Sequence, residues 1–435
     1  MATRVAGQGL PGQNYYLATA AAAPAIPELA GTRDAEVCIV GGGFAGLNTA
    51  LGLVERGVHG VVLLEARSVG HGASGRNGGF VFGGFSRSPA DLLRELGPER
   101  AKRLYGGTIE GIELIRSRIG RYSIPCRPVD AGVYWTNWFR DPKVLHECRD
   151  LMRRHFDREL AFVPRAQLRE LVRSERYSDA LFEANAMHFQ PLDYVRGIAR
   201  AAIGQGAALF ERSPAVALER IASGWRVRTP NGVVHAKQVV LACGGYLAGL
   251  RRKVDAGVLP IATYVMVTEA LDARMQDILR TRAAIYDTRF AFDYYRPLPD
   301  DRLLWGGRIS VLDRSPTQVR RLLRRDMLKV FPSLDDVRIE YAWSGLMSYA
   351  RHEMPQIGQV EDGLWLAQAF GGHGVAPTTF AGEVLASAIA EGDERWREFA
   401  DYGLVSALKP AGFAGAQLTY WWLEAKDAWR AWREA

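Results

Sequence analysis

A glycine-rich turn places the strongest restriction on the fold of this 435-residue chain. It runs from Gly41 through Phe44 and Ala45 to Gly46, after a β-branched run over 36–40 and before apolar residues at helical spacing over 47–54. Gly41 permits a tight turn out of the strand, Gly43 lets the backbone approach a phosphate, and Gly46 lets the helix pack on the sheet. A second apolar run over 61–64 completes a predicted βαβ unit.

Glu65 ends that second strand, 19 residues after Gly46. A carboxylate at this position accepts both hydroxyls of an adenosine ribose and repels a 2′-phosphate. The unit is therefore predicted to bind a dinucleotide. A second glycine-rich segment over 66–79 follows at once and favours FAD over NAD, because an isoalloxazine needs a slot in the backbone near the first βαβ unit.

A third glycine-rich turn, over 370–375, follows a strand-like run over 364–367 and opens a predicted helix over 375–391. Its amide donors and the positive end of the helix dipole suit the pyrimidine oxygen of a flavin and negative charge at N1. The turn is therefore expected to contact the ring system of the cofactor.

The rest of the pattern predicts interleaved domains. Residues 1–33 are rich in Ala, Gly and Pro and are expected to form an arm on the body. The aromatic-rich stretch 260–309 alternates and predicts an antiparallel sheet. Helices are expected over 89–120 and 315–331. Further strands are expected over 132–135, 216–221, 225–228 and 233–243.

Composition narrows the class of protein. Hydrophobic residues make up 48% and charged residues 24%, which is typical of a globular chain. The net charge of +7 is spread out without a basic block, which favours a solvated surface over a nucleic-acid site. The four cysteines lack C-x-x-C spacing, and no run is long enough to span a membrane. We expect free thiols, no metal site and a cytoplasmic location.

Taken together, these motifs resemble the D-amino-acid-oxidase/glycine-oxidase superfamily of FAD-dependent amine and amino-acid oxidoreductases. Within it they are most similar to the bacterial gamma-glutamylputrescine oxidase group. The likeness extends in order over nearly the whole chain. The segments that carry it are 14–16, 41–46, 65–67, 74–79, 293–296, 301–307, 343–345, 354–358 and 372–375.

The resemblance implies a mixed α/β fold, in which a Rossmann-type FAD-binding domain is interleaved with an antiparallel-sheet substrate domain. The FAD-binding domain would comprise 34–90, 160–250 and 340–400, and the substrate domain 91–159 and 251–339, followed by a C-terminal helical segment over 401–435. The residues expected to contact FAD are Gly41, Gly43, Phe44, Ala45, Gly46, Glu65, Ala66, Arg67, Gly72, Ala73, Ser74, Arg76, Asn77, Gly78, Gly79, Val216, Cys243, Gly244, Gly345, Gly371, Gly372, His373, Gly374 and Val375.

The activity implied by the resemblance is oxidation of the CH–NH bond of an amine or amino acid. A hydride passes to flavin N5, the imine is hydrolysed, and oxygen takes the electrons to give hydrogen peroxide. The alternatives are a quinone-linked amino-acid dehydrogenase and a non-catalytic FAD-binding partner protein. Non-covalent FAD is expected, since no cysteine follows Cys243; a histidyl flavin on His71 is the less favoured alternative.

Three departures from the group affect the predicted substrate. Phe80 replaces a usual Gln, Phe370-Gly371 replaces a usual Tyr-Ser, and Ala376-Pro-Thr378 replaces a polar pair and Cys. The first two make the pocket less polar. A gamma-glutamyl polyamine is therefore disfavoured, and a bulkier or more apolar amine is expected.

Four side chains are candidates for catalytic roles, each beside a structural alternative. His373 either adjoins the flavin as a local positive charge or bonds to backbone at a helix start. Arg296 either pairs with a substrate carboxylate or is an ordinary sheet arginine. His352 faces the flavin or the surface, and Tyr264 lines the pocket or lies in the core.

The C-terminal segment predicts a helix with a tryptophan-rich face. Its residues at helical spacing are Leu418, Trp421, Trp422, Ala425, Trp429 and Trp432. Because the charges on the other face balance, we expect the tryptophan face to dock on the body or on a partner subunit, so an oligomer is possible. Contact with a membrane interface is the alternative.

Overall fold

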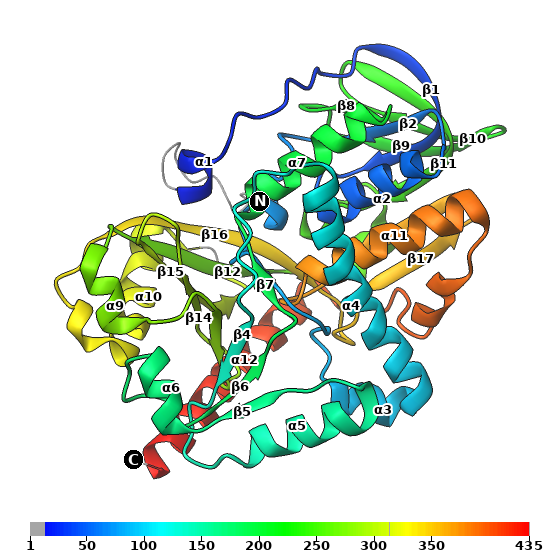
Figure 1. The fold of residues 1–435 in the computed structure, drawn as a ribbon. Coiled ribbons are helices and arrows are strands. Elements are labelled where there is room, and N and C mark those ends of the chain that lie inside the picture. Colours follow the sequence, from blue (N-terminus) through cyan, green and yellow to red (C-terminus); the bar gives the residue numbers. More distant parts are fainter. Residues whose placement is uncertain (1–13, 313, 435) are drawn as a thin grey trace.

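The computed structural model describes residues 14–312 and 314–434 as two eight-stranded sheets, a short two-stranded sheet and the helices around them (Figure 1). The expected mixed α/β fold is confirmed. The helices are α1 (Tyr15–Thr19), α2 (Phe44–Glu55), α3 (Pro89–Leu96), α4 (Pro98–Arg121), α5 (Lys143–Phe156), α6 (Arg165–Leu171), α7 (Pro191–Gly204), α8 (Arg252–Ala256), α9 (Met275–Ile278), α10 (Pro316–Val330), α11 (Val375–Glu391) and α12 (Ala411–Arg433).

The first sheet has the strand order β17-β18-β11-β1-β2-β8, and β10 and β9 extend it from β11. Its members are β1 (Gly31–Val40), β2 (Val61–Leu64), β8 (Ala208–Phe210), β9 (Ala217–Ile221), β10 (Gly224–Arg228), β11 (Gly232–Leu241), β17 (Gln356–Glu361) and β18 (Leu364–Gln368). The β1, β2, β8, β11 and β18 pairs are parallel, so their carboxyl ends meet at one edge. The predicted βαβ unit is confirmed, with β1 starting five residues earlier than expected because it pairs with β11 from Gly31 onward.

The second sheet has the order β16-β12-β15-β14-β13-β4-β6-β5. Its members are β4 (Val133–Thr136), β5 (Ala161–Val163), β6 (Ala180–Glu183), β12 (Leu259–Thr268), β13 (Ala284–Asp287), β14 (Tyr294–Pro297), β15 (Leu303–Ser310) and β16 (Ile339–Tyr349). The antiparallel pairing predicted for 260–309 is confirmed, and β13 also pairs parallel with β4. Helix α10 packs on one face of this sheet through Leu323 and Met327.

Several segments predicted to belong to the FAD-binding domain lie in the second sheet. Strands β5 and β6, which the expected boundaries assign to the FAD-binding part, pair within the second sheet, as does β16. A short two-stranded sheet of β3 (Phe80–Val81) and β7 (Met187–His188) follows the second glycine-rich segment. The chain therefore passes between the two sheets more often than the predicted domain boundaries state.

Helices α2, α11 and α4 form a tight layer beside the first sheet (Figure 1). The predicted helix over 89–120 is divided at Gly97, which has a φ of +76°. Glycines on α4 allow a close approach to α11. A Cβ built on Gly107 would lie 2.2 Å from the Phe380 ring, and one on Gly111 would lie 2.5 Å from the Ala376 carbonyl oxygen.

The expected N-terminal arm is described from residue 14 onward, and residues 1–13 lie outside the described part. Tyr15 and Tyr16 of α1 are buried, and the Tyr16 hydroxyl donates a 2.8 Å hydrogen bond to the Asn77 carbonyl. This part of the arm lies on the body, as expected, and contacts the second glycine-rich segment.

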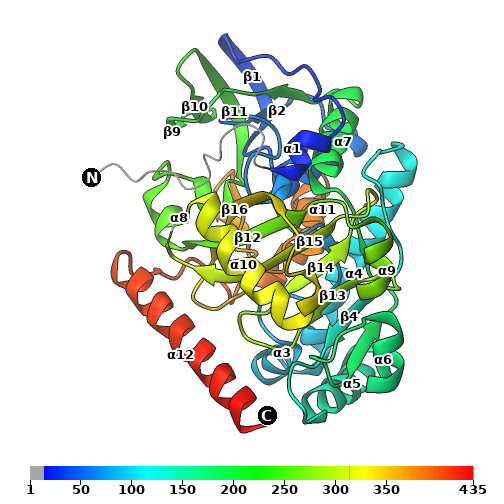
Figure 2. The same ribbon diagram turned by 90° about the vertical axis from the view of Figure 1, so that its left-hand side faces the viewer.

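Helix α12 lies along one edge of the molecule (Figure 2) and docks by the face opposite to the one predicted. Gln417 is buried and accepts hydrogen bonds from the Ser310 hydroxyl (3.0 Å) and the Val311 amide (3.1 Å). Trp422 and Trp432 are 62% and 74% exposed. The tryptophan face does not pack on the body, because the other face does so through Gln417 and through Phe413 and Tyr420. Docking of the tryptophan face on a partner subunit, and its contact with a membrane interface, stay predictions. Across 14–312 and 314–434, no helix has the length and apolarity needed to cross a membrane.

Candidate active site

The first glycine-rich turn leaves the carboxyl end of β1 and enters α2. A Cβ built on Gly41, whose φ is +117°, would lie 2.5 Å from the Ala242 carbonyl oxygen, and one on Gly46 would lie 2.0 Å from the Gly41 carbonyl oxygen. Only glycine fits these two positions. Gly43 is the N-cap of α2 and provides no side-chain cap, so the positive end of the helix dipole faces the space beyond the turn.

Glu65 holds this turn in place. Its carboxylate accepts hydrogen bonds from the Gly42 amide (2.8 Å) and the Arg67 amide (2.9 Å). Burial raises the pKa of Glu65, and these amide donors oppose the increase. Each carboxylate oxygen has a second lone pair that remains able to accept a ribose hydroxyl.

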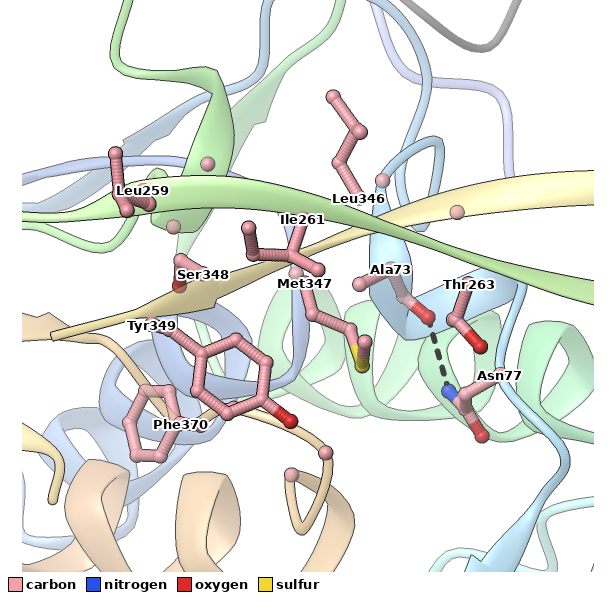
Figure 3. Close-up of a pocket in the computed structure, with 18 of the residues that line it drawn as sticks. Ala73, Asn77, Leu259, Ile261, Thr263, Leu346, Met347, Ser348, Tyr349 and Phe370 are labelled. Atoms are coloured by element: carbon pink, nitrogen blue, oxygen red, sulfur yellow. Dashed lines mark hydrogen bonds between the residues drawn. The ribbon is translucent and has the colours of Figure 1, made fainter. Parts of the chain in front are cut away.

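The second glycine-rich segment is fastened to the first. The Phe44 amide donates to the Ser74 hydroxyl (2.9 Å), and the Asn77 side chain donates to the Ala73 carbonyl (3.0 Å; Figure 3). Arg76 is buried and donates to the His71 carbonyl (2.7 Å). Burial lowers the pKa of His71 to about 4, so this imidazole is neutral at pH 7.

One cavity of about 1160 Å³ joins both segments to the third glycine-rich turn and to the second sheet. Most residues expected to contact FAD line it. They are Gly41, Gly43, Phe44, Ala45, Glu65, Ala66, Arg67, Gly72, Ala73, Ser74, Arg76, Asn77, Gly78, Cys243, Gly244, Gly345, Gly371, Gly372, His373, Gly374 and Val375.

Three of the expected contacts lie outside the lining. Gly46 packs helix against strand, and Gly79 packs against the Phe189 carbonyl, where a Cβ would lie 2.1 Å from the oxygen. Val216 is 59% exposed, and its neighbours Pro214 and Ala215 line the cavity instead. At this point the cavity is lined by the two residues that immediately precede Val216.

The third turn presents the N-terminus of α11 to the cavity. Gly371 has a φ of +59°, the Gly372 amide donates to the Ser86 hydroxyl (3.1 Å), and the N-cap Gly374 provides no side-chain cap. The His373 ring stands edge-on to Phe82 at 5.0 Å. Burial lowers the pKa of His373 to about 4, so the expected positive charge is absent at pH 7.

Strands β12 and β16 form a wall of the cavity, β12 through every second residue and β16 through the continuous run 345–349. Leu259 lies opposite Tyr349, Ile261 opposite Met347, and Thr263 opposite Gly345. Figure 3 shows Ile261, Met347 and Tyr349 on the cavity side of the two strands.

Tyr264 points to the other face of β12, where its hydroxyl donates to the Leu312 carbonyl (2.7 Å) in the core beneath α10. The predicted pocket role of Tyr264 is therefore corrected, because neighbouring side chains of a strand face opposite ways.

An aromatic cluster forms the far wall, and sequence reasoning had identified only part of it. Its members are Phe80, Phe82, Tyr286, Phe292 and Tyr294. Phe82 stacks on Tyr286 at 5.3 Å, and Phe80 meets Tyr294 edge-on at 5.5 Å. The alternation of β13 and β14 was the available signal for Tyr286 and Tyr294, but Phe82 and Phe292 lie in irregular segments with no such signal.

The two remaining catalytic candidates lie outside the cavity lining and form hydrogen bonds with backbone groups. Arg296 is buried and donates to the Gly78 carbonyl (2.7 Å) and the Phe189 carbonyl (2.9 Å), outside the cavity lining. His352 contacts the Gly403 carbonyl (3.2 Å) and accepts from the Met354 amide (3.2 Å). Both placements correct the predicted roles, since their polar atoms are engaged in holding loops together.

Comparisons with known proteins agree with this site. The family model described as FAD dependent oxidoreductase (DAO) matches residues 36–388. The chain is 33% identical over 390 residues to gamma-glutamylputrescine oxidoreductase of Escherichia coli, covering 89% of this chain and 91% of the relative. It is 32% identical over 376 residues to a probable oxidoreductase, OrdL, of Haemophilus influenzae, covering 85% and 86%.

A likeness in fold extends further. The crystal structure of glycine oxidase from Geobacillus kaustophilus superposes with a TM-score of 0.72 at 21% identity, covering 86% of this chain and 98% of that one. L-proline dehydrogenase from P. horikoshii gives a TM-score of 0.72 at 18% identity, covering 87% and 100%. At these identities the likeness shows the fold alone.

Proposed function

The chain belongs to the DAO family of FAD-dependent oxidoreductases, and from this premise we propose that it oxidises the CH–NH bond of an amine bearing an apolar or aromatic group. One observation carries the proposal. The dinucleotide turn, the N-terminus of α11 and the aromatic cluster all line the same cavity.

The residues present fit FAD. Gly41 permits the tight turn, Gly43 leaves room for a pyrophosphate at the start of α2, and Glu65 would hold the ribose. The turn before Val375 offers amide donors to the flavin ring. When bound, FAD supplies the acceptor for a hydride from the substrate carbon. We propose non-covalent binding, since no cysteine follows Cys243 in the chain.

The aromatic cluster would act by removing water from the substrate. An amine gives up a hydride only when its nitrogen is uncharged, and an apolar wall lowers the pKa of a buried ammonium group. Phe82 and Tyr286, stacked beside the third turn, would position the apolar part of the substrate next to the reacting carbon.

An amine is favoured over an α-amino acid because the two arginines of the second sheet in this region, one on β14 and one on β15, are both engaged. Arg296 holds backbone carbonyls away from the cavity. Arg308 lines the cavity but pairs with Asp326 through two hydrogen bonds of 2.7 and 2.9 Å. Neither is available without breaking contacts of the fold. We propose oxygen as the final acceptor, with hydrogen peroxide as product.

The test is an anaerobic titration that follows the absorbance of oxidised flavin at about 450 nm. The panel contains arylalkyl and long-chain alkyl amines, polyamines and α-amino acids. Bleaching by the apolar amines, with peroxide formed on admission of oxygen, is expected. Bleaching by amino acids alone would overturn the proposed substrate class, and no bleaching would leave a non-catalytic FAD protein.

Variants at the aromatic cluster sharpen this test. Phe82→Ala is expected to raise KM for arylalkyl amines by roughly tenfold, the effect of losing an aromatic contact of about 1.4 kcal/mol. Phe162→Ala, in β5 and stacked on His146 instead, serves as the matched control. Flavin released into the supernatant after acid precipitation would support non-covalent binding.

A further inference from the structure

Helix α12 carries its acidic groups on the face turned toward the body. Asp427 accepts a hydrogen bond from the Phe290 amide (2.8 Å), Glu424 lies 3.5 Å from Arg308, and Glu434 pairs with Arg430 (2.9 Å). All three carboxylates are partly buried. The side of the helix that docks carries these carboxylates together with Phe413, Ala416 and Tyr420, and the opposite side is left to solvent.

The outward face is apolar and aromatic. Leu418 is 63% exposed, Trp421 52%, Trp422 62%, Trp429 57% and Trp432 74%. Four exposed indoles within twelve residues form a patch of the kind that marks an interaction surface. Each indole also has an N–H that needs a polar partner, which suits a boundary between apolar and wet surroundings.

The charges on this outward face have one sign. Lys426 lies with Nζ 5.6 Å over the Trp422 ring, and Arg433 lies 4.8 Å over the Trp429 ring. Both are exposed, whereas the carboxylates of α12 face the body. The face therefore combines tryptophan, leucine and cations, a composition complementary to an apolar layer with an anionic surface.

We propose that this outward face of α12 binds the surface of an anionic lipid bilayer, with the helix lying in the plane of the interface. Indoles favour the headgroup boundary, and cations beside them attract anionic lipids. A second copy of the chain fits less well, because a two-fold contact would set this cationic face against itself. The inference does not depend on the proposed substrate.

The position of α12 gives the contact a consequence for the cavity. Gly415, Ala416, Thr419 and Tyr420 of the same helix line the cavity, and Tyr420 meets Phe290 at 5.8 Å. A chain held on a bilayer by the outer face of α12 would keep one wall of its cavity next to lipid. This consequence, unlike the binding itself, rests on the proposed function: an apolar amine dissolved in the membrane would then reach the site without crossing bulk water.

The experiment measures sedimentation of the FAD-loaded full chain with vesicles of equal parts phosphatidylglycerol and phosphatidylcholine, and with phosphatidylcholine alone. We expect binding to the anionic vesicles that falls as salt is raised. Lys426→Glu with Arg433→Glu should weaken it by at least about 25-fold, since each basic residue near the surface contributes about fivefold. Replacing Trp422 and Trp432 by Ser should weaken binding to both kinds of vesicle.

The matched control is Arg321→Glu with Arg325→Glu, which makes the same change in net charge on exposed positions of α10. It should retain most of the binding. Flavin content and circular dichroism establish that each variant is folded.

Absence of vesicle binding by the wild type, or equal loss in the control, would overturn the proposal. A change of molecular mass in light scattering for the tryptophan variant, without vesicle binding by the wild type, would assign the face to a second copy instead.

Discussion

The Phe44 amide at the start of α2 donates a 2.9 Å hydrogen bond to the Ser74 hydroxyl. This contact joins the first glycine-rich turn to the second across 30 residues of sequence. It fixes the spacing between the end of the cavity suited to a pyrophosphate and the loop expected to contact the flavin. A disturbance at either turn should therefore be measurable as lost cofactor.

Gly43→Val tests this arrangement. A Cβ at this position would lie 2.9 Å from the Ser74 hydroxyl oxygen, and the added methyl groups would extend into the cavity. We expect FAD affinity to fall by more than about tenfold, equivalent to 1.4 kcal/mol. The flavin-to-protein ratio after gel filtration measures it. Gly106→Val in α4, where a Cβ meets nothing within 4 Å, should keep its flavin.

Glu65→Ala removes an acceptor that two backbone amides share. The loss unpairs the Gly42 and Arg67 amides and removes the proposed ribose contact. Hydrogen bonds to a charged group contribute about 1.5–3 kcal/mol, so FAD should bind roughly 10- to 100-fold more weakly. Fluorescence titration of the apoprotein with FAD measures the dissociation constant. Unchanged affinity would refute the ribose assignment. The control is Glu36→Ala, within β1 and paired with Lys237.

Arg296→Met should affect stability rather than substrate binding. The guanidinium is buried and holds the Gly78 and Phe189 carbonyls. Losing these charge-assisted bonds is expected to cost about 3 kcal/mol in the free energy of unfolding. Urea denaturation measures the cost, with Arg321→Met on α10 as the surface control. A large rise in KM with unchanged stability would restore the substrate-binding role.

His188 should make stability depend on pH. Burial, together with the nearby Arg296, lowers the pKa of this imidazole to about 3. Its Nε2 contacts the Arg282 carbonyl at 2.8 Å and its Nδ1 faces Arg296 at 3.2 Å, which fits a neutral ring. The unfolded chain therefore binds the proton more readily than the folded one between the folded value of about 3 and the unfolded value near 6.5.

The contribution of the neutral His188 ring to the free energy of unfolding is thus fully present above pH 6.5 and is lost as the pH falls. Between pH 6.5 and 5 the loss amounts to about 2 kcal/mol. Chemical denaturation across this range measures the free energy of unfolding of the wild type and of His188→Gln. The difference between the two values should become smaller as the pH falls. Parallel curves for the two proteins would contradict the assignment.

The parts of the site that depend on local pattern were predictable from sequence. The turn at Gly41, the strand that ends at Glu65 and the helix that starts at Val375 each need only a few neighbours to define them. Alternation along β12 was also readable, yet it does not say which face meets the cavity. Thr263 and Tyr264 are equally compatible with either face until α10 covers one of them.

Long-range pairing decides the remaining residues. Arg296 reaches the Gly78 carbonyl across 218 positions, and no feature of the sequence near it predicts that partner. The orientation of helix α12 likewise depends on partners that are distant in the sequence. Its tryptophans suggest the buried side, but Gln417 and Asp427 find partners on β15 and beside Phe290, which turn the helix the other way.

The close packing of α4 on α11 has a consequence for the electronics of the cavity. Gly111 lets the backbone of α4 lie directly against the Ala376 carbonyl, one residue into α11. The distance between these helices therefore sets how far the first amides of α11 extend toward the cavity, and with it the local electric field. A methyl group at Gly111 would lie 2.5 Å from that carbonyl oxygen, so the first turn of α11 could keep its present place only while this position of α4 has no side chain.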